Sequence, residues 1–275
     1  MRLATIREGD GTRAVRIDGD EIVDLGAPDV GAVLRRPDWL PWAAGAEGRR
    51  DPLIGCEYAP LVTAPDKIVC VGLNYKSHIA ETGATTPAFP TLFAKYRGAL
   101  VGACDDIVLP DESESSAVDY EAELAVIVGR AVRRATREEA AAAIAGFAVL
   151  NDVSVRDWQR RTEQWLQGKT WERSTPLGPW LVTADESPGP SRRITCEVSG
   201  DLLQDGNTDD LLFSPAEVVA YLSTFITLEP GDVIATGTPA GVGAARTPPR
   251  FLADGDVVVT AIEGLGEQRN HCRRG

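Results

Sequence analysis

DYEAELAVIVG, residues 119–129, is the strongest structural signal in the chain: acidic residues open it and an apolar run completes it. The run Glu123–Val128 predicts a buried strand, because it is short, rich in β-branched residues and followed by Gly129. Side chains alternate between the two faces of a strand, so Glu121 and Glu123 are expected to point the same way. Two ionised carboxylates on one buried face are costly unless a positive charge lies between them. The stretch therefore predicts a site for a divalent cation.

Short apolar segments of this kind recur along the chain and predict a fold that is mostly β with a few helices, an α+β class. Two helices are expected, because Thr136 and Ser214 each begin a capping box; they would end near Gly146 and Leu222. With only two or three helices expected, a regular alternation of strands and helices is excluded. The strands expected beyond residue 60 are Ile68–Val71, Ile107–Leu109, Glu123–Val128, Phe147–Leu150, Trp180–Val182, Ile194–Val198, Val233–Ala235 and Val257–Ile262.

The beginning of the chain predicts a small N-terminal β subdomain, residues 1–60. Arg2–Ile6 and Arg13–Ile17 are expected to pair, and Asp18-Gly19 turns the chain toward a third strand. The segment GAEGRRDP, rich in glycine and charge, then serves as a connection. We expect the remainder, residues 61–275, to form a second, larger domain.

Composition excludes several classes of protein. The 275 residues carry a formal net charge of −13, which argues against a protein that binds nucleic-acid phosphates. We expect no membrane association, since no apolar stretch reaches the length of a membrane span. The five cysteines are scattered without a CxxC pair, and the N-terminus lacks an apolar signal core. The expected location is therefore the reducing cytoplasm.

A third acidic residue is placed like the first two. Asn151-Asp152 follows the apolar strand Gly146–Leu150, so Asp152 joins Glu121 and Glu123 if the two strands are neighbours. Three carboxylates without histidine or cysteine suit a hard cation, Mg²⁺ or Mn²⁺. The alternative is that each acid is a solvated surface residue, which is the commoner situation for an isolated E-x-E. The apolar run that follows Glu123 weakens that alternative.

His78 and Glu81 form a second candidate pair. Their spacing places both side chains on one face of a helical turn. A carboxylate beside an imidazole raises its basicity and holds its tautomer, as the activation of water requires. A surface pair without a catalytic role is an equally good interpretation of the spacing.

Lys169 and a glycine-rich loop are further candidates. QGKT, residues 167–170, is not a phosphate loop, because Glu163 stands where that motif needs glycine. Lys169 could instead neutralise charge that develops on a substrate, or it could be an exposed lysine. The loop TGTPAGVG, residues 236–243, could present backbone N–H groups to a substrate carboxylate. A tight structural turn is the alternative for that loop.

These motifs, taken in order, resemble the fumarylacetoacetate hydrolase family. The resemblance is closest to its bacterial branch of 2-oxo-acid hydrolases, decarboxylases and isomerases, and it runs from about Lys67 to Gly243. No single motif is specific, but their order is. The motifs are NYKSHIAETG, DYEAEL, NDVSVRDWQ, QWLQGKTWERSTPLGPW, LQDGNTDDLLFS and VIATGTPAGVG.

The resemblance implies that residues 61–275 form a catalytic domain, a mixed β-sandwich or β-roll of the fumarylacetoacetate hydrolase type. It also implies a homodimer and a small 2-oxo or diketo acid as substrate. It assigns the metal, Mg²⁺ or Mn²⁺, to Glu121, Glu123 and Asp152. Catalytic roles fall on His78, Glu81 and Lys169, and substrate-binding roles on Arg156, Gln159, Gly237 and Thr238. The segment after Lys169 departs from the family, so Glu172 and Arg173 are expected, with Arg156, to set selectivity.

The function predicted first is hydrolysis of a carbon–carbon bond in a β-diketo acid of the acylpyruvate or fumarylacetoacetate type. The metal and Lys169 would stabilise an enolate, while His78, oriented by Glu81, activates water. The same enolate also serves a decarboxylase or an isomerase or tautomerase, with oxaloacetate or 2-hydroxyhepta-2,4-dienedioate as the type of substrate. A relative that binds metal or ligand without catalysis is the remaining alternative.

Overall fold

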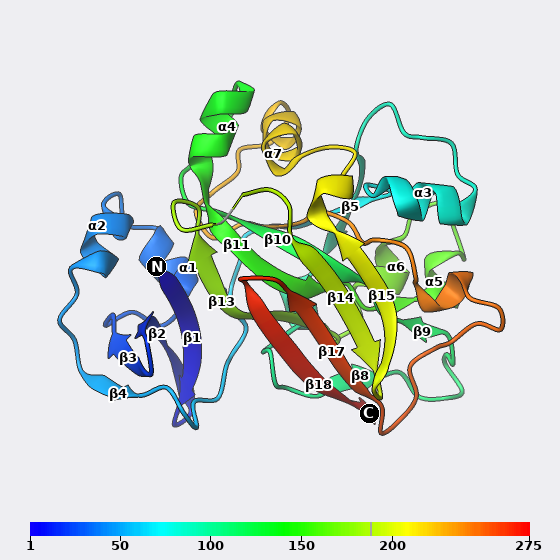
Figure 1. Ribbon diagram of the computed structural model, residues 1–275, viewed down its shortest axis with the longest axis horizontal. Helices are drawn as coiled ribbons and strands as arrows, with labels where there is room; N and C mark the ends of the chain where they lie inside the picture. The colour runs from blue at the N-terminus through cyan, green and yellow to red at the C-terminus, as the bar shows by residue number, and fades with distance from the viewer. Residues whose placement is uncertain (188) are drawn as a thin grey trace.

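The computed structural model describes residues 1–187 and 189–275, which form one large sheet, one smaller sheet and a two-stranded sheet of β9 (Val118–Asp119) and β12 (Ser154–Val155) (Figure 1). The large sheet has 11 strands. In spatial order they are β4 (Arg50–Pro52), β3 (Glu21–Asp24), β2 (Gly11–Asp18), β1 (Arg2–Glu8), β13 (Thr175–Thr183), β11 (Ile144–Asn151), β10 (Ala122–Val128), β16 (Val233–Ala235), β5 (Ile68–Gly72) and β6 (Thr91–Lys95), with β7 (Leu100–Val101) beside β13.

The smaller sheet packs on one face of the large one. Its order is β15 (Asp201–Asn207), β14 (Arg193–Val198), β17 (Val257–Ile262), β18 (Gly266–Arg274) and β8 (Ile107–Leu109). Leu124 and Val149 from the large sheet share a buried apolar cluster with Ile194, Cys196 and Val258 from the smaller one. Burial of apolar surface between the two sheets is therefore the main stabilising contribution in this half of the molecule.

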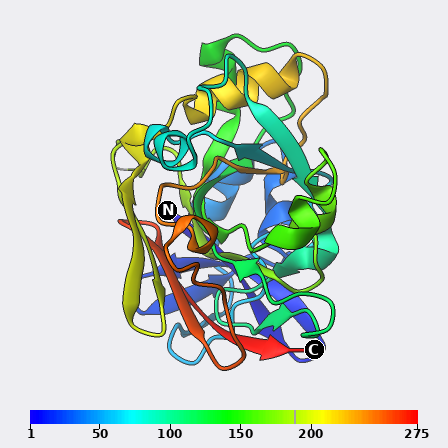
Figure 2. The same ribbon diagram turned by 90° about the vertical axis from the view of Figure 1, so that its right-hand side faces the viewer.

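Helices occupy the periphery. The described residues form α1 (Val30–Leu34), α2 (Trp39–Ala44), α3 (Lys76–Thr82), α4 (Arg137–Ala143), α5 (Arg156–Gln159), α6 (Leu166–Lys169) and α7 (Pro215–Ser223). Figure 2 shows α4 and α7 together at one end of the molecule. Both predicted capping boxes are present, at Thr136 and Ser214. No helix in the described ranges is long and apolar enough to cross a membrane.

The predicted class, mostly β with peripheral helices, is confirmed. Every strand expected from the sequence is present, but β11 begins three residues and β13 five residues before the expected start. The expected number of helices was too low, because five of the seven found are short segments of four to seven residues without a long apolar period. The first predicted helix was also too long. It ends at Ala143 because the chain passes directly into β11 at Ile144.

The C-terminal strand β18 was not predicted, because its inward side chains are largely polar. Gln268 and Asn270 are fully buried beside the apolar Cys272. The Gln268 amide donates hydrogen bonds to the carbonyls of Val149 and Gly178, at 2.9 and 3.1 Å. Burial of amide groups is tolerated here because backbone acceptors are available.

The N-terminal strands continue the large sheet. β1 pairs antiparallel with β13, from Arg2 opposite Val182 to Ala4 opposite Trp180. In Figure 1 this N-terminal part lies on the left, away from α3 and α5. The division into residues 1–60 and 61–275 stays a prediction.

Candidate active site

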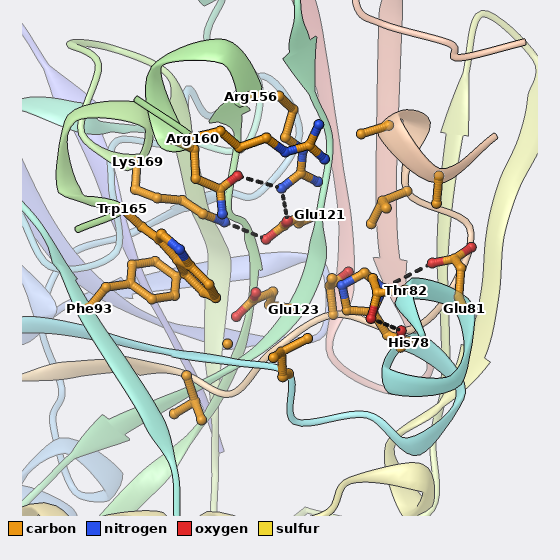
Figure 3. Close-up of a pocket in the computed structure, with 18 residues that line it drawn as sticks. His78, Glu81, Thr82, Phe93, Glu121, Glu123, Arg156, Arg160, Trp165 and Lys169 are labelled. Carbon is orange, nitrogen blue, oxygen red and sulfur yellow. Dashed lines mark hydrogen bonds and ion pairs between the residues drawn. The ribbon is translucent and has the colours of Figure 1, made fainter. Parts of the chain in front are cut away.

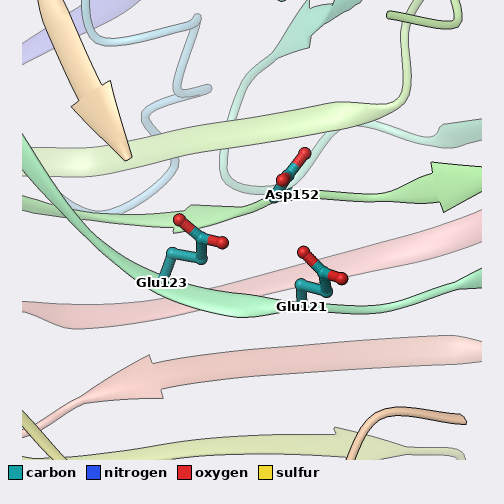
Figure 4. Close-up of side chains that lie close together, drawn as sticks. All are labelled: Glu121, Glu123 and Asp152. Carbon is teal, nitrogen blue, oxygen red and sulfur yellow. The ribbon is translucent and has the colours of Figure 1, made fainter. Parts of the chain in front are cut away.

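Three buried carboxylates gather where β10 begins and the neighbouring strand β11 ends. The antiparallel register places Ala122 opposite Asn151, and the Asp152 N–H donates to the Glu121 carbonyl at 2.8 Å. Each of Glu121, Glu123 and Asp152 offers a carboxylate oxygen, and these oxygens lie within 4.8 Å of one another (Figure 4). The three acids expected as metal ligands are therefore brought together by one pair of strands.

Two of the three carboxylates are surrounded by cations. Lys169 Nζ lies 2.7 Å from a Glu121 oxygen and 2.8 Å from an Asp152 oxygen. Lys95 Nζ takes the other Asp152 oxygen at 2.6 Å. A guanidinium nitrogen of Arg156 takes the other Glu121 oxygen at 2.7 Å (Figure 3). All four oxygens of these two acids thus have a charged partner.

Glu123 differs from both. One of its oxygens accepts the Gly237 N–H at 2.8 Å, and the described part of the chain places no lysine or arginine within 4.0 Å of it. Burial would raise the pKa of Glu121, but the charges of Lys169 and Arg156 outweigh it and lower that pKa to about 2. Burial and the charges of Asp152 and Glu121 raise the pKa of Glu123 well above its usual range.

This difference between Glu123 and the other two acids fits the binding of a divalent metal ion. Glu123 is a buried carboxylate next to two others, so a cation between them would remove the cost of ionising it. The donor set is oxygen only, which suits Mg²⁺ or Mn²⁺ rather than zinc. Glu121, Glu123 and Asp152 are the residues that would hold the ion.

A cavity of about 440 Å³ opens in front of the cluster. Glu121 and Glu123 line it, while Asp152 lies behind them and is fully buried. The remaining lining comes from α3, α5, α6, the β5 and β6 strands and the glycine-rich loop. It consists of Val71, Gly72, Leu73, His78, Glu81, Thr82, Phe93, Arg156, Gln159, Arg160, Trp165, Lys169, Thr238, Val242, Ala244 and Ala245.

The His78–Glu81 pair forms on α3, as the spacing predicted. His78 Nδ1 lies 2.9 Å from one Glu81 oxygen, and the other Glu81 oxygen accepts the Gly241 N–H at 2.8 Å. Figure 3 shows the pair on the side of the pocket away from Lys169. With Nδ1 engaged by a carboxylate, Nε2 is the ring nitrogen left to exchange a proton.

The glycine-rich loop organises the acids. Its N–H groups at Gly237, Gly241 and Gly243 donate to Glu123, Glu81 and Asp119, respectively. Gly237 has φ +100°, and a Cβ there would meet the Val71 carbonyl at 3.0 Å. Thr238 lines the pocket, and its hydroxyl accepts from Gln204 at 2.8 Å. Binding of substrate by Thr238 and Gly237 stays a prediction.

Arg156 and Gln159 are tied into the same network. The Arg156 guanidinium contacts Asp119 at 2.7 Å and Glu121 at 2.7 Å, and it donates to the Gln159 side chain at 3.0 Å. Both residues line the pocket, and their substrate-binding roles stay predictions. Glu172 and Arg173, expected to influence selectivity, are outside the pocket lining.

Three further residues of the site were not predicted from the sequence. Lys95 ends β6 and is fully buried, a position rare for lysine without a partner. Asp119 accepts from Arg156 and from the Gly243 and Ala244 N–H groups, so it joins α5 to the loop. Arg160 lines the pocket directly after α5. Only Asp119 stood inside a recognised motif.

Comparison with known proteins places the chain in a family. The model described as "Fumarylacetoacetate (FAA) hydrolase C-terminal" matches residues 67–273. The chain belongs to the fumarylacetoacetate hydrolase family. The resemblance of its ordered motifs and the expected fold type are thereby confirmed.

Relatives within the fumarylacetoacetate hydrolase family carry different activities in their names. The mitochondrial oxaloacetate tautomerase of Bos taurus is 48% identical over 208 residues, which cover 74% of this chain and 66% of that protein, just under two thirds of its length. The solved fumarylacetoacetate hydrolase of Exiguobacterium antarcticum is 31% identical with a TM-score of 0.88, covering 100% of both chains. The solved 2-hydroxyhepta-2,4-diene-1,7-dioate isomerase of Mycobacterium marinum is 31% identical with a TM-score of 0.79, covering 100% of this chain and 98% of that one.

Proposed function

We propose that this chain is a divalent-metal-dependent tautomerase that interconverts the keto and enol forms of a 2-oxo acid of the oxaloacetate type. The observation that carries the proposal is one pocket with a three-carboxylate cluster on one side and the His78–Glu81 pair on the other. The similarity to an oxaloacetate tautomerase favours tautomerisation over the hydrolysis that the motifs ranked first.

Tautomerisation breaks a C–H bond next to the keto group and forms an O–H bond on the keto oxygen. His78 is the base: Glu81 holds its Nδ1, so Nε2 takes the proton from carbon and returns it to oxygen. The Gly241 N–H fixes the second Glu81 oxygen, which keeps the imidazole oriented. The proton is conserved, so no water or oxidant is consumed.

Lys169 stabilises the negative charge that develops on the keto oxygen during proton transfer. Its ammonium is held by Glu121 and Asp152 and lies 4.8 Å from the centre of the Phe93 ring. A charge fixed in this way needs no reorganisation when the substrate becomes an enolate. A divalent ion on Glu121, Glu123 and Asp152 would add Lewis-acid polarisation of the same oxygen.

The proposal is tested by following the absorbance of enol oxaloacetate with the purified chain, with and without Mg²⁺. Acceleration over the spontaneous rate is expected with Mg²⁺, and a loss of at least about 100-fold is expected in His78→Gln. A wild-type rate equal to the spontaneous one, with metal bound, would overturn tautomerisation.

Hydrolysis is the second candidate, because the same oriented imidazole also suits the activation of water. The likeness to a fumarylacetoacetate hydrolase supports it. Release of acetate from acetylpyruvate would identify hydrolysis, and release of CO₂ from oxaloacetate would identify decarboxylation. The homodimer and the cytoplasmic location stay predictions.

A further inference from the structure

The basic residues that line the pocket are not equivalent. Lys169 and Arg156 are each shared between two acids and are almost fully buried. Arg160 is exposed, and within the described residues no carboxylate lies at ion-pair distance from it. Arg160 is therefore the pocket cation whose guanidinium is available for a ligand.

The backbone that carries Arg160 is held firmly. Arg160 caps α5, and its N–H donates to the Arg156 carbonyl at 3.1 Å. α5 lies directly on α6, since a Cβ on Gly168 would come within 2.3 Å of the backbone nitrogen of Gln159. Figure 3 shows the Arg160 side chain entering the pocket on the side of Arg156 and Lys169. Its position is thus set by the same helices that hold the charge-stabilising groups.

The charges around the acid cluster indicate the charge of the ligand that Arg160 would bind. Four buried acids, Glu121, Glu123, Asp152 and Asp119, face the three buried bases Lys95, Arg156 and Lys169. A divalent ion would change this excess negative charge of the cluster into one positive charge, and Arg160 raises it to two. The remaining acid of the lining, Glu81, lies on the far side of the pocket beside His78. A substrate with two carboxylates brings the balancing charge. One of these would lie at the 2-oxo end, in front of the acid cluster, and the other farther out.

We propose that Arg160 binds the second carboxylate of the substrate and so selects dicarboxylic 2-oxo acids over those with a neutral tail. This inference rests on the proposed function, because the 2-oxo end is assumed to lie at the acid cluster. The planar fork of a guanidinium matches a carboxylate with two parallel hydrogen bonds. The cavity of about 440 Å³ has room for a ligand of this size.

Arg160→Gln tests the proposal, with Arg161→Gln as the matched control. Arg161 is the adjacent arginine, but it stacks on Trp158 at 3.5 Å and is outside the pocket lining. Each variant removes one positive charge, so general electrostatics change equally. For oxaloacetate, Arg160→Gln should raise KM roughly 10- to 100-fold, as expected for loss of a charged hydrogen-bond pair. For the 4-methyl ester of oxaloacetate KM should change less than about twofold.

Calorimetric binding of oxaloacetate and its 4-methyl ester with Mg²⁺ separates this inference from the proposed function. If the wild type binds the diacid more tightly and Arg160→Gln removes that preference, Arg160 has the proposed role even without turnover. Arg160→Lys should restore part of the preference. Equal weakening of both ligands by Arg160→Gln, an effect of Arg161→Gln on the preference, or no effect of either variant overturns the proposal.

Discussion

The two walls of the pocket are built differently. The wall that carries the acid cluster, here called the sheet wall, combines the ends of β10 and β11 with Lys95 from β6 and Lys169 from α6. The side chains of the two lysines are 0% and 2% exposed, and each is bound to Asp152. The helix wall carries His78 and Glu81 on seven-residue α3, with side chains 12% and 22% exposed. Groups that hold charge thus stand in a buried network, whereas the group assigned to move a proton is partly exposed on a short helix.

This difference suits the chemistry proposed. Electrostatic stabilisation depends on charges that do not move, and a buried network supplies them. A proton-transfer group needs exchange with solvent and a passage for substrate, which a short helix at the rim provides. Substitutions in the sheet wall should therefore affect folding and metal binding as well as turnover, whereas those in the helix wall should affect turnover alone.

The largest effect is expected for Lys95→Met. Removing this ammonium leaves a fully buried Asp152 oxygen and the Val153 carbonyl without their donor, which should cost about 3–5 kcal/mol of unfolding free energy. Urea unfolding measures it. Arg193→Gln is the control, since the exposed Arg193–Asp205 pair should contribute only about 0–1 kcal/mol. Equal losses in the two variants would remove the distinction between buried and surface pairs.

The second-largest effect is expected for removal of the metal ion. Saturation with Mg²⁺ at about 100 times its Kd should stabilise the chain by about 2.7 kcal/mol, and EDTA should reverse this. In Glu123→Gln the increase in Tm with Mg²⁺ should disappear, because that carboxylate is the one without a lysine or arginine partner in the described structure. Glu81→Gln should keep the whole increase. A shift that survives in Glu123→Gln would place the ion elsewhere.

Glu81→Gln tests the helix wall. The amide oxygen can still accept the Gly241 N–H, but the neutral side chain no longer stabilises a protonated His78. We expect kcat to fall about 100-fold, the lower range for general acid–base catalysis, with unfolding free energy changed by less than about 0.5 kcal/mol. An unchanged kcat with a raised KM would assign Glu81 to binding instead of proton transfer.

The two walls also differ in how far the sequence predicted them. Glu121, Glu123 and His78 were found because short-range periodicity places them on one face of a strand or a helical turn. Lys95 could not be found in this way: its partner Asp152 is 57 residues away and joins it only through the order of the large sheet. The same applies to β18, whose buried Gln268 amide donates to carbonyls of β11 and β13. Local pattern thus identified the acids of the cluster, and only topology revealed the cations that neutralise them.

The smallest expected effect concerns the attachment of α3. The Ser77 N–H, in the first turn of the helix, donates to Asp210 at 2.9 Å, so this carboxylate satisfies a free helix N–H from outside the helix. Asp210→Ala should cost about 0.5–1.5 kcal/mol, which is the usual contribution of one such hydrogen bond. Since the loss is confined to the helix wall, amide hydrogen exchange should rise in α3 while β10 and β11 stay protected. Faster exchange in both regions would show that the two walls open as one unit.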